Sequence, residues 1–184
     1  AIEQILNDIF LSKRDVWRVA NLRYFNPIGA HNSGLLGEDI SGKPTNIFPQ
    51  IINVAMKKLD YLRIFGNNWD TNDGTCVRDY IHIMDLSEGH VRTLDYLLNS
   101  NSQIINMNIG TGLGTSVLEL VKLFEDSTNI RIPYLFEERR AGDKAYSVAD
   151  NSLAKKILNW QPQKNLHDMC IDCWKWVTKN PNGY

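Results

Sequence analysis

Segments with strand-like and helix-like patterns alternate along this chain, and that alternation constrains its fold more than any other feature. The stretch 19–25 (VANLRYF) is rich in β-branched and aromatic residues and stops at an Asn-Pro pair, as a strand does. The first eleven residues instead place apolar side chains at three- and four-residue steps, which predicts an amphipathic helix. Because the two patterns take turns, the sequence predicts an α/β fold.

The remaining segments continue the alternation. Further strands are predicted at 62–65, 77–82, 104–109 and 132–136, and further helices at 47–56, 86–98, 116–126, 151–158 and 165–177. Asp85 is the predicted N-cap of the helix that follows it, and Ser116 with Glu119 forms a capping box. The stretch 29–49 is rich in glycine, asparagine and proline, which predicts a long functional loop.

The composition narrows the class of protein. A chain of 184 residues, of which 43% are hydrophobic, is long and apolar enough to bury a core. Its net charge of −1 gives no indication of a nucleic-acid-binding surface. Its apolar runs are short, so no membrane span is predicted, and the first residues lack the pattern of a signal peptide. Three cysteines without framework spacing favour a reducing, cytoplasmic location.

Cys170 and Cys173 form a CxxC pair, which raises a redox or zinc hypothesis. Such a site is expected to bring a second pair of ligands or a thioredoxin-like context. Here the cysteines recur with Met169, Trp174 and Val177 at helical steps. The buried stripe of a helix is therefore the preferred interpretation, and no metal site is predicted.

The stretch 110–116 (GTGLGTS) lies between a predicted strand and a predicted helix, where a dinucleotide-binding turn would lie. Its spacing is GxGxG, Thr115 stands where the third glycine would fall, and no P-loop Gly-Lys-Ser/Thr is present. A tight, capped turn is the preferred interpretation. A role beside a ligand stays open, because a helix N-terminus offers free N–H groups.

Four polar segments that are far apart in the sequence indicate an anionic ligand. They are Arg23–Pro27, Pro44–Ile47, Arg78–His82 and Glu138–Asp143. Loops at strand ends bind ligands in α/β sheets, and two arginine-bearing segments suit a diphosphate, because guanidinium groups pair with phosphate oxygens. Asparagine side chains donate and accept, which suits base edges and sugar hydroxyls. Taken singly, Arg78 with Asp79 could be a surface ion pair, and the two arginines at 139–140 a solvated turn.

Taken together, the segments 22–39 (LRYFNPIGAHNSGLLGED), 62–91, 106–121 and 138–143 (ERRAGD) closely resemble the UDP-glucose 4-epimerases, which are extended short-chain dehydrogenases/reductases. The resemblance covers nearly the whole chain, and the stretch 73–82 (DGTCVRDYIH) is its most specific part.

The resemblance implies the C-terminal part of a Rossmann-type enzyme together with its small α/β substrate domain. Residues 1–30 and 83–110 would then belong to the Rossmann domain, and 31–82 and 111–184 to the substrate domain.

The resemblance also assigns roles to matched positions. Phe25 would contact NAD through its backbone, near the nicotinamide. Asn26 would hold the sugar or the diphosphate, and Asn46 with Ile47 would contact the nucleotide-sugar from the long loop.

Arg63, Ile64 and Phe65 would line the uracil, largely through backbone groups. Arg78 and Arg140 would clamp the diphosphate.

Asp143 would hold a ribose hydroxyl. Tyr80 and His82 are expected to be structural and to orient Arg78. Ser147 stands where some of these enzymes carry a large tyrosine, so the resemblance predicts room for N-acetylated UDP-sugars. A one-residue gap would place the adjacent Tyr146 there instead.

In this family a glycine fingerprint binds NAD, which takes the hydride, and a Tyr-x-x-x-Lys pair supplies the base. The lysine lowers the pKa of the tyrosine, as a nearby cation should. This apparatus is expected before Ala1, so the chain is predicted to bind a UDP-sugar but to be inactive without its missing N-terminal half. The complete enzyme is expected to be a homodimer.

Three other interpretations stay open. The chain could be part of a sister enzyme, such as a dehydratase or decarboxylase acting on nucleotide-sugars. It could also be a non-catalytic nucleotide-sugar-binding module, or a redox or metal protein built on Cys170 and Cys173.

Overall fold

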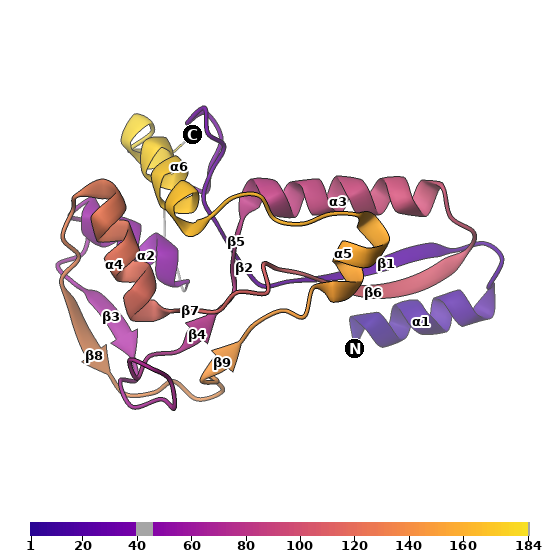
Figure 1. Cartoon of the computed structure of the whole chain (residues 1–184), viewed down its shortest axis with the longest axis horizontal. Coiled ribbons are helices and arrows are strands. Elements are labelled where there is room, and N and C mark those ends of the chain that lie inside the picture. Colours follow the sequence, from indigo (N-terminus) through magenta and orange to yellow (C-terminus); the bar gives the residue numbers. More distant parts are fainter. Residues whose placement is uncertain (40–45, 184) are drawn as a thin grey trace.

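The computed structural model of this protein describes residues 1–39 and 46–183. Two packed groups of elements lie side by side along the longest axis of the molecule (Figure 1). Two residues of the second polar segment, Pro44 and Thr45, lie outside the described residues.

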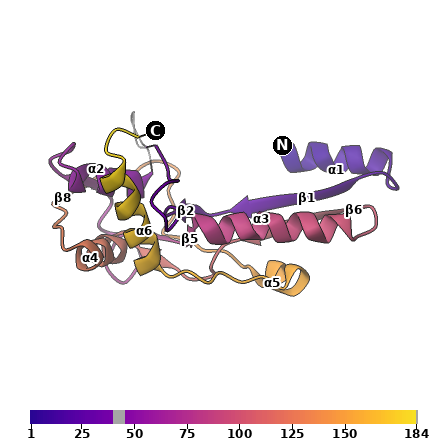
Figure 2. The same ribbon diagram turned by 90° about the horizontal axis from the view of Figure 1, so that it is seen from above.

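The first group is built on a parallel pair of strands. Strands β1 (Arg18–Tyr24) and β6 (Gln103–Ile109) pair residue for residue along their whole length. Helices α1 (Ile2–Ser12) and α3 (Ile83–Leu98) flank this pair on opposite sides, as Figures 1 and 2 show together. Helix α5 (Ser152–Leu158) packs against β6 and α3. The small core of this group contains Ile81, Leu86, Met107, Ile109, Ala154, Leu158 and Trp160. We call it the strand-pair group.

The second group surrounds a larger core. Helices α2 (Ile47–Ala55), α4 (Val117–Thr128) and α6 (Leu166–Lys179) pack with the parallel strands β3 (Leu62–Phe65) and β8 (Tyr134–Glu137). The interior is apolar, and its most deeply buried members include Ile51, Ile52, Leu62, Leu120, Phe124, Ile132 and Trp176. We call it the pocket group, because the candidate site lies beside it.

Short strands connect the two groups. Strand β2 (Asn26–Ile28) runs parallel to β5 (Tyr80–His82), and β4 (Val77–Arg78) lies between β7 (Thr115–Ser116) and β9 (Tyr146–Ser147).

The sequence predicted one extended segment at 77–82, and the structure divides it at Asp79. The residues on either side of Asp79 pair in different sheets. Strand β2 was not predicted, because an Asn-Pro pair usually ends a strand.

The helix boundaries test the capping predictions. The capping box of Ser116 and Glu119 is confirmed, with both reciprocal hydrogen bonds present. Asp85 as an N-cap is wrong, because α3 starts earlier and His82 caps it by accepting a hydrogen bond from the backbone N–H of Met84. Asp85 instead accepts a hydrogen bond from the backbone N–H of Lys164 at 2.9 Å.

The cysteines of α6 face the core, as the helical-stripe interpretation predicted. Cys170 and Cys173 are buried free thiols. Burial raises the pKa of Cys170 to about 12 and raises the pKa of Cys173 as well, so both remain protonated thiols. Trp176 rather than Trp174 is the fully buried tryptophan of this helix.

Among residues 1–39 and 46–183, no helix combines the length and apolar character that crossing a bilayer requires.

Candidate functional site

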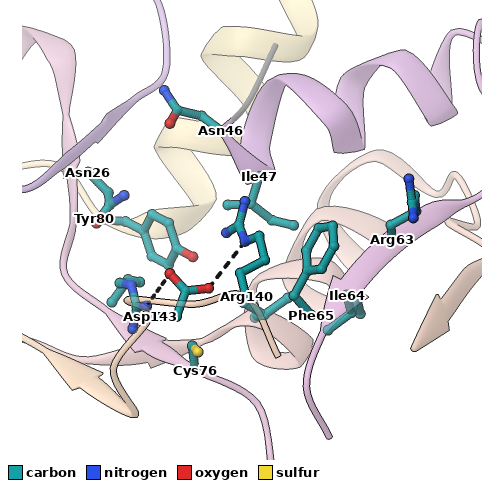
Figure 3. A pocket seen from close by; sticks show the side chains of 12 residues that line it. Asn26, Asn46, Ile47, Arg63, Ile64, Phe65, Cys76, Tyr80, Arg140 and Asp143 are labelled. Carbon is teal, nitrogen blue, oxygen red and sulfur yellow. Dashed lines mark hydrogen bonds and ion pairs between the residues drawn. The ribbon is translucent and has the colours of Figure 1, made fainter. Parts of the chain in front are cut away.

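One cavity gathers side chains from both halves of the sequence. It is lined by Asn26, Asn46, Ile47, Arg63, Ile64, Phe65, Cys76, Arg78, Tyr80, Val117, Arg140 and Asp143 (Figure 3). Nine of the ten residues predicted to bind the substrate are therefore brought together, and only Ser147 does not line the cavity. Strand ends and loops of β2, α2, β3, β4 and β5 supply most of the wall, as expected for α/β proteins.

Arg78 is held firmly at the wall of this cavity. Its Nη1 donates to the carbonyl oxygens of Val77, at 2.9 Å, and of Lys144, at 2.8 Å. Its Nη2 lies 3.7 Å from Oδ1 of Asp143, and the side chain is only 18% exposed. Tyr80 and His82 were expected to orient Arg78, but among the described residues neither forms a hydrogen bond with it; its hydrogen bonds go to two backbone carbonyls, and its ion pair goes to Asp143.

Arg140 approaches the same carboxylate from the other side of the cavity. Its Nε donates to Oδ2 of Asp143 at 3.2 Å, and its guanidinium carbon lies 4.5 Å from the centre of the Phe65 ring. Its side chain is half exposed. Both arginines therefore meet at Asp143. Figure 3 shows the contact between Arg140 and Asp143 as a dashed line.

The neighbouring arginine, Arg139, is engaged elsewhere. Its guanidinium carbon stacks 4.1 Å from the Trp69 ring centre, and it donates to both the side chain and the backbone of Asn68. Both arginines at 139–140 are exposed, but each has an aromatic partner, so they are not merely solvated side chains of a turn. Of the two, Arg140 lines the cavity.

Strand β3 forms the part of the wall predicted for a base. It pairs with β8 along one edge, and among the described residues no strand pairs with its other edge. Ile64 is buried, while Arg63 is exposed and pairs with Glu137 at 2.9 Å. Backbone groups on this open edge are therefore in a position to bond to a ligand, although the Phe65 carbonyl already accepts a hydrogen bond from Nε1 of Trp69 at 3.2 Å.

Asp79 organises the segments around the cavity. Its buried carboxylate accepts hydrogen bonds from Thr111, through N–H and hydroxyl, and from the N–H groups of Gly112 and Ala149. Its backbone N–H donates to the Ser147 carbonyl, and its carbonyl accepts from the N–H of Asn26. A surface ion pair between Arg78 and Asp79 is therefore a wrong interpretation, because Asp79 is an internal acceptor.

The same contacts decide between the two interpretations of the glycine-rich turn at 110–114. Two N–H groups of the turn are already bonded to Asp79, and the following helix is capped by Ser116. The tight, capped turn is confirmed, and these donors do not form a cradle for a dinucleotide.

Ser147 lies beside the cavity rather than in its wall. In β9 it pairs with Arg78 of β4, and it is half-buried while its neighbour Tyr146 is exposed. Phe25, the predicted contact for NAD, lines a smaller adjoining cavity with Asn26 and Asn46.

A larger hollow of about 630 Å³ lies nearby, but its chemistry does not suit an anion. Its lining includes apolar Leu36, Ile83 and Met84 and the carboxyl of Glu38, whose pKa is raised by burial. No arginine or lysine lines it among the described residues. The cavity with the two arginines is therefore the better anion site.

Three lining residues were not predicted as ligand contacts: Cys76, Tyr80 and Val117. A signal for two of them was present, because Cys76, Arg78 and Tyr80 alternate in an extended segment. Alternate positions of a strand share one face, so choosing Arg78 should have drawn attention to both neighbours. Burial raises the pKa of the Cys76 thiol, which therefore acts as an apolar wall.

Comparison with known proteins gives a consistent result. A family profile described as GDP-mannose 4,6 dehydratase matches residues 10–173. A UDP-glucose 4-epimerase of Bacillus subtilis is 50% identical over 183 residues, which is 100% of this chain and 53% of the relative.

Two solved structures share the fold closely. The UDP-glucose 4-epimerase of Bifidobacterium longum, in complex with NAD+ and UDP, has a TM-score of 0.93, 45% identity and coverage of 99% and 53% of the two chains. The enzyme of Stenotrophomonas maltophila, with bound NAD and formylated UDP-arabinopyranose, has a TM-score of 0.92, 46% identity and coverage of 97% and 52%. This chain thus spans about half the length of the relatives that it matches.

Proposed function

This chain belongs to the family described by the GDP-mannose 4,6 dehydratase profile, and within it we propose that the chain is the UDP-sugar-binding half of a UDP-glucose/UDP-galactose 4-epimerase. The relatives support this proposal over a dehydratase. Four proteins that are 45–50% identical to this chain are named as UDP-glucose 4-epimerases. The fold class is that of an extended short-chain dehydrogenase/reductase.

One observation supports the proposal most strongly. Arg78 and Arg140 come from segments 62 residues apart, yet both guanidinium groups contact Asp143 at one cavity. A diphosphate carries more negative charge than one carboxylate, so it would complete the pairing of these two cations.

The proposed roles are those that the family resemblance implies, and the shared cavity supports them. Arg78 and Arg140 hold the diphosphate, with Asn26 beside it for the phosphate or the sugar. The open edge of β3, at residues 63–65, holds the uracil, and Asn46 with Ile47 closes the wall nearby. Asp143 holds a ribose hydroxyl once the diphosphate takes over the arginines.

The whole enzyme is proposed to be a cytoplasmic homodimer that uses NAD. Bound NAD would supply a transient oxidation at C4 of the sugar, and Phe25 would contact it through the backbone. We keep as a proposal the division in which 1–30 and 83–110 belong to the Rossmann domain and 31–82 and 111–184 to the substrate domain. The two cores follow it only in part, because Ile28 and Ala30 pack in the core of the pocket group and Ile81 packs in that of the strand-pair group. Helix α5 is an exception in its packing, since it contributes to the core of the strand-pair group.

We also propose that Ser147 leaves room for N-acetylated UDP-sugars. The residue follows the exposed Tyr146 and lies next to Arg78 in the sheet. In the full-length enzyme, Ser147→Tyr should reduce turnover of UDP-GalNAc far more than turnover of UDP-galactose. An enzyme that never acts on UDP-GalNAc, while acting well on UDP-galactose, would contradict this.

Calorimetry on the 184-residue chain tests the central proposal. UDP should bind, ADP should bind more weakly because its base does not match β3, and NAD should bind weakly or not at all. Equal affinities for UDP and ADP would exclude a uracil site. Tight binding of NAD by this chain would contradict the assignment of the cavity to the UDP-sugar.

A further inference from the structure

The hydroxyl of Tyr80 is a polar group without a partner inside the molecule. The residue is 2% exposed, and its hydroxyl makes no hydrogen bond to any of the described residues. Tyr80 also lines the cavity that holds Arg78, Arg140 and Asp143. Figure 3 shows its hydroxyl on the side of the ring that faces Asp143 and Arg140.

The groups around Tyr80 do not require its hydroxyl. Arg78 is fixed by two backbone carbonyls, and Asp143 is paired with both arginines. The ring itself packs in the apolar core of the pocket group. A phenylalanine would fill that space equally well and would avoid the cost of a buried, unsatisfied hydroxyl.

The chemistry of the site indicates what the hydroxyl meets. Burial raises the pKa of Tyr80, so the phenol stays neutral and keeps its proton available for donation. The cavity also concentrates positive charge, because two arginines share one carboxylate. A phosphoryl oxygen drawn in by these cations is an acceptor that fits a neutral donor, and hydrogen bonds to charged acceptors are the stronger kind.

We propose that the Tyr80 hydroxyl is a ligand-binding group that donates a hydrogen bond to a phosphoryl oxygen of the bound nucleoside diphosphate. This proposal deepens the proposed function and depends on it. It adds a neutral donor to the two cations, and it explains why a tyrosine occupies a place where only its ring has partners.

The Tyr80→Phe variant separates binding from folding. Its melting temperature without ligand should equal or exceed that of the parent, because an unsatisfied group is removed. Its affinity for UDP, measured by calorimetry, should fall about 10- to 100-fold, the loss expected for a hydrogen bond to a charged group. Binding of uridine, which has no phosphate, should be unchanged in ligand-observed NMR.

Tyr96→Phe is the matched control. The Tyr96 hydroxyl donates to the side chain of Gln103 at 3.1 Å in the strand-pair group, away from the cavity. This variant should bind UDP as the parent does.

Each other outcome has a defined meaning. Parent-like UDP affinity in Tyr80→Phe would overturn the Tyr80 inference alone, and so would an equal loss for uridine or a marked loss of stability without ligand. No UDP binding by the parent chain would overturn the proposed function and this inference together.

Discussion

The two groups of elements use similar sequence patterns but bury them very differently. Helix α6 of the pocket group buries six residues, among them Trp176 and Met169. Helix α1 of the strand-pair group is equally amphipathic in sequence and buries none, so that Ile2 and Ile5 are 74% and 57% exposed. An apolar stripe thus shows that a helix has a face to cover, but it does not show what covers that face.

The difference extends to the sheets and to the site. Strands β1 and β6 pair only with one another among the described residues, which leaves two long edges unpaired. The pocket group instead has a filled core, and it holds Phe65, Arg140 and Asp143 beside that core. The proposed binding of a UDP-sugar therefore depends on the pocket group rather than on the strand-pair group. Four experiments can break or sharpen the contrast between the two groups.

The largest expected effect is the loss of a core tryptophan. Trp176→Ala should lower the free energy of unfolding by about 3–5 kcal/mol, because it empties a fully buried site. It also removes the indole N–H that donates to the Glu38 carbonyl at 2.9 Å. Trp17→Ala in the strand-pair group, where the side chain is 43% exposed, should cost less than about 1 kcal/mol. Urea denaturation measures the free energy of unfolding of both variants. Equal losses of this free energy would contradict the contrast between the pocket group and the strand-pair group.

The next effect concerns the anion clamp. Arg78→Ala should weaken UDP binding by about 3 kcal/mol, roughly 100-fold, since a well-placed guanidinium makes charge-assisted hydrogen bonds to phosphate. Arg92→Ala is the control, because Arg92 lies on α3 and, within the described part of the chain, forms an ion pair with Glu88 alone, at 2.7 Å. Calorimetry should show unchanged UDP binding for the control. A similar loss in both variants would mean that general charge, rather than the cavity, binds UDP.

Much of this architecture follows from the sequence. Local rules predicted α2, β3, α4 and α6 closely, because periodicity and capping act within a few residues. The family resemblance predicted nine residues of the cavity, which lie up to 117 positions apart.

What escaped prediction depends on tertiary contacts. The predicted N-cap of α3 was wrong, because His82 can be recognised as the N-cap only from its position at the end of β5. The acceptor role of the Asp79 carboxylate needs two other segments, at Thr111–Gly112 and at Ala149, to converge on it, and no local pattern indicates that. The unpartnered hydroxyl of Tyr80 can be seen only once every neighbour has been placed.

A third experiment tests the junction between the two groups. His82 is buried there, and its Nε2 lies 3.3 Å from Asp172 of α6, with Asp85 and Lys164 also nearby. Burial lowers the pKa of His82 and outweighs the opposite effect of Asp172. The unfolded chain therefore binds the proton more readily than the folded chain.

The neutral, buried His82 therefore contributes to the free energy of unfolding above pH about 6.5, and this contribution is lost as the pH falls through the lowered pKa of His82. The free energy of unfolding should change by at most about 1.4 kcal/mol per pH unit from this group. Urea denaturation between pH 5 and 8 should show this loss for the parent and a flatter profile for His82→Gln. His167→Gln, at an exposed position of α6, should keep the parent profile. A parent-like slope in His82→Gln would assign the pH dependence to another group.

The smallest effect on stability is expected on α1. Ile5→Glu should change the free energy of unfolding by no more than about 0.5 kcal/mol, because the side chain is already 57% exposed. Ile51→Glu, at a fully buried position of α2, should instead prevent folding, since it places a charge in the core. Ile5→Glu should also reduce self-association in sedimentation velocity, because it interrupts an exposed apolar face. A loss of more than about 2 kcal/mol in Ile5→Glu would mean that α1 is packed as firmly as α6, and the contrast between the two groups would fail.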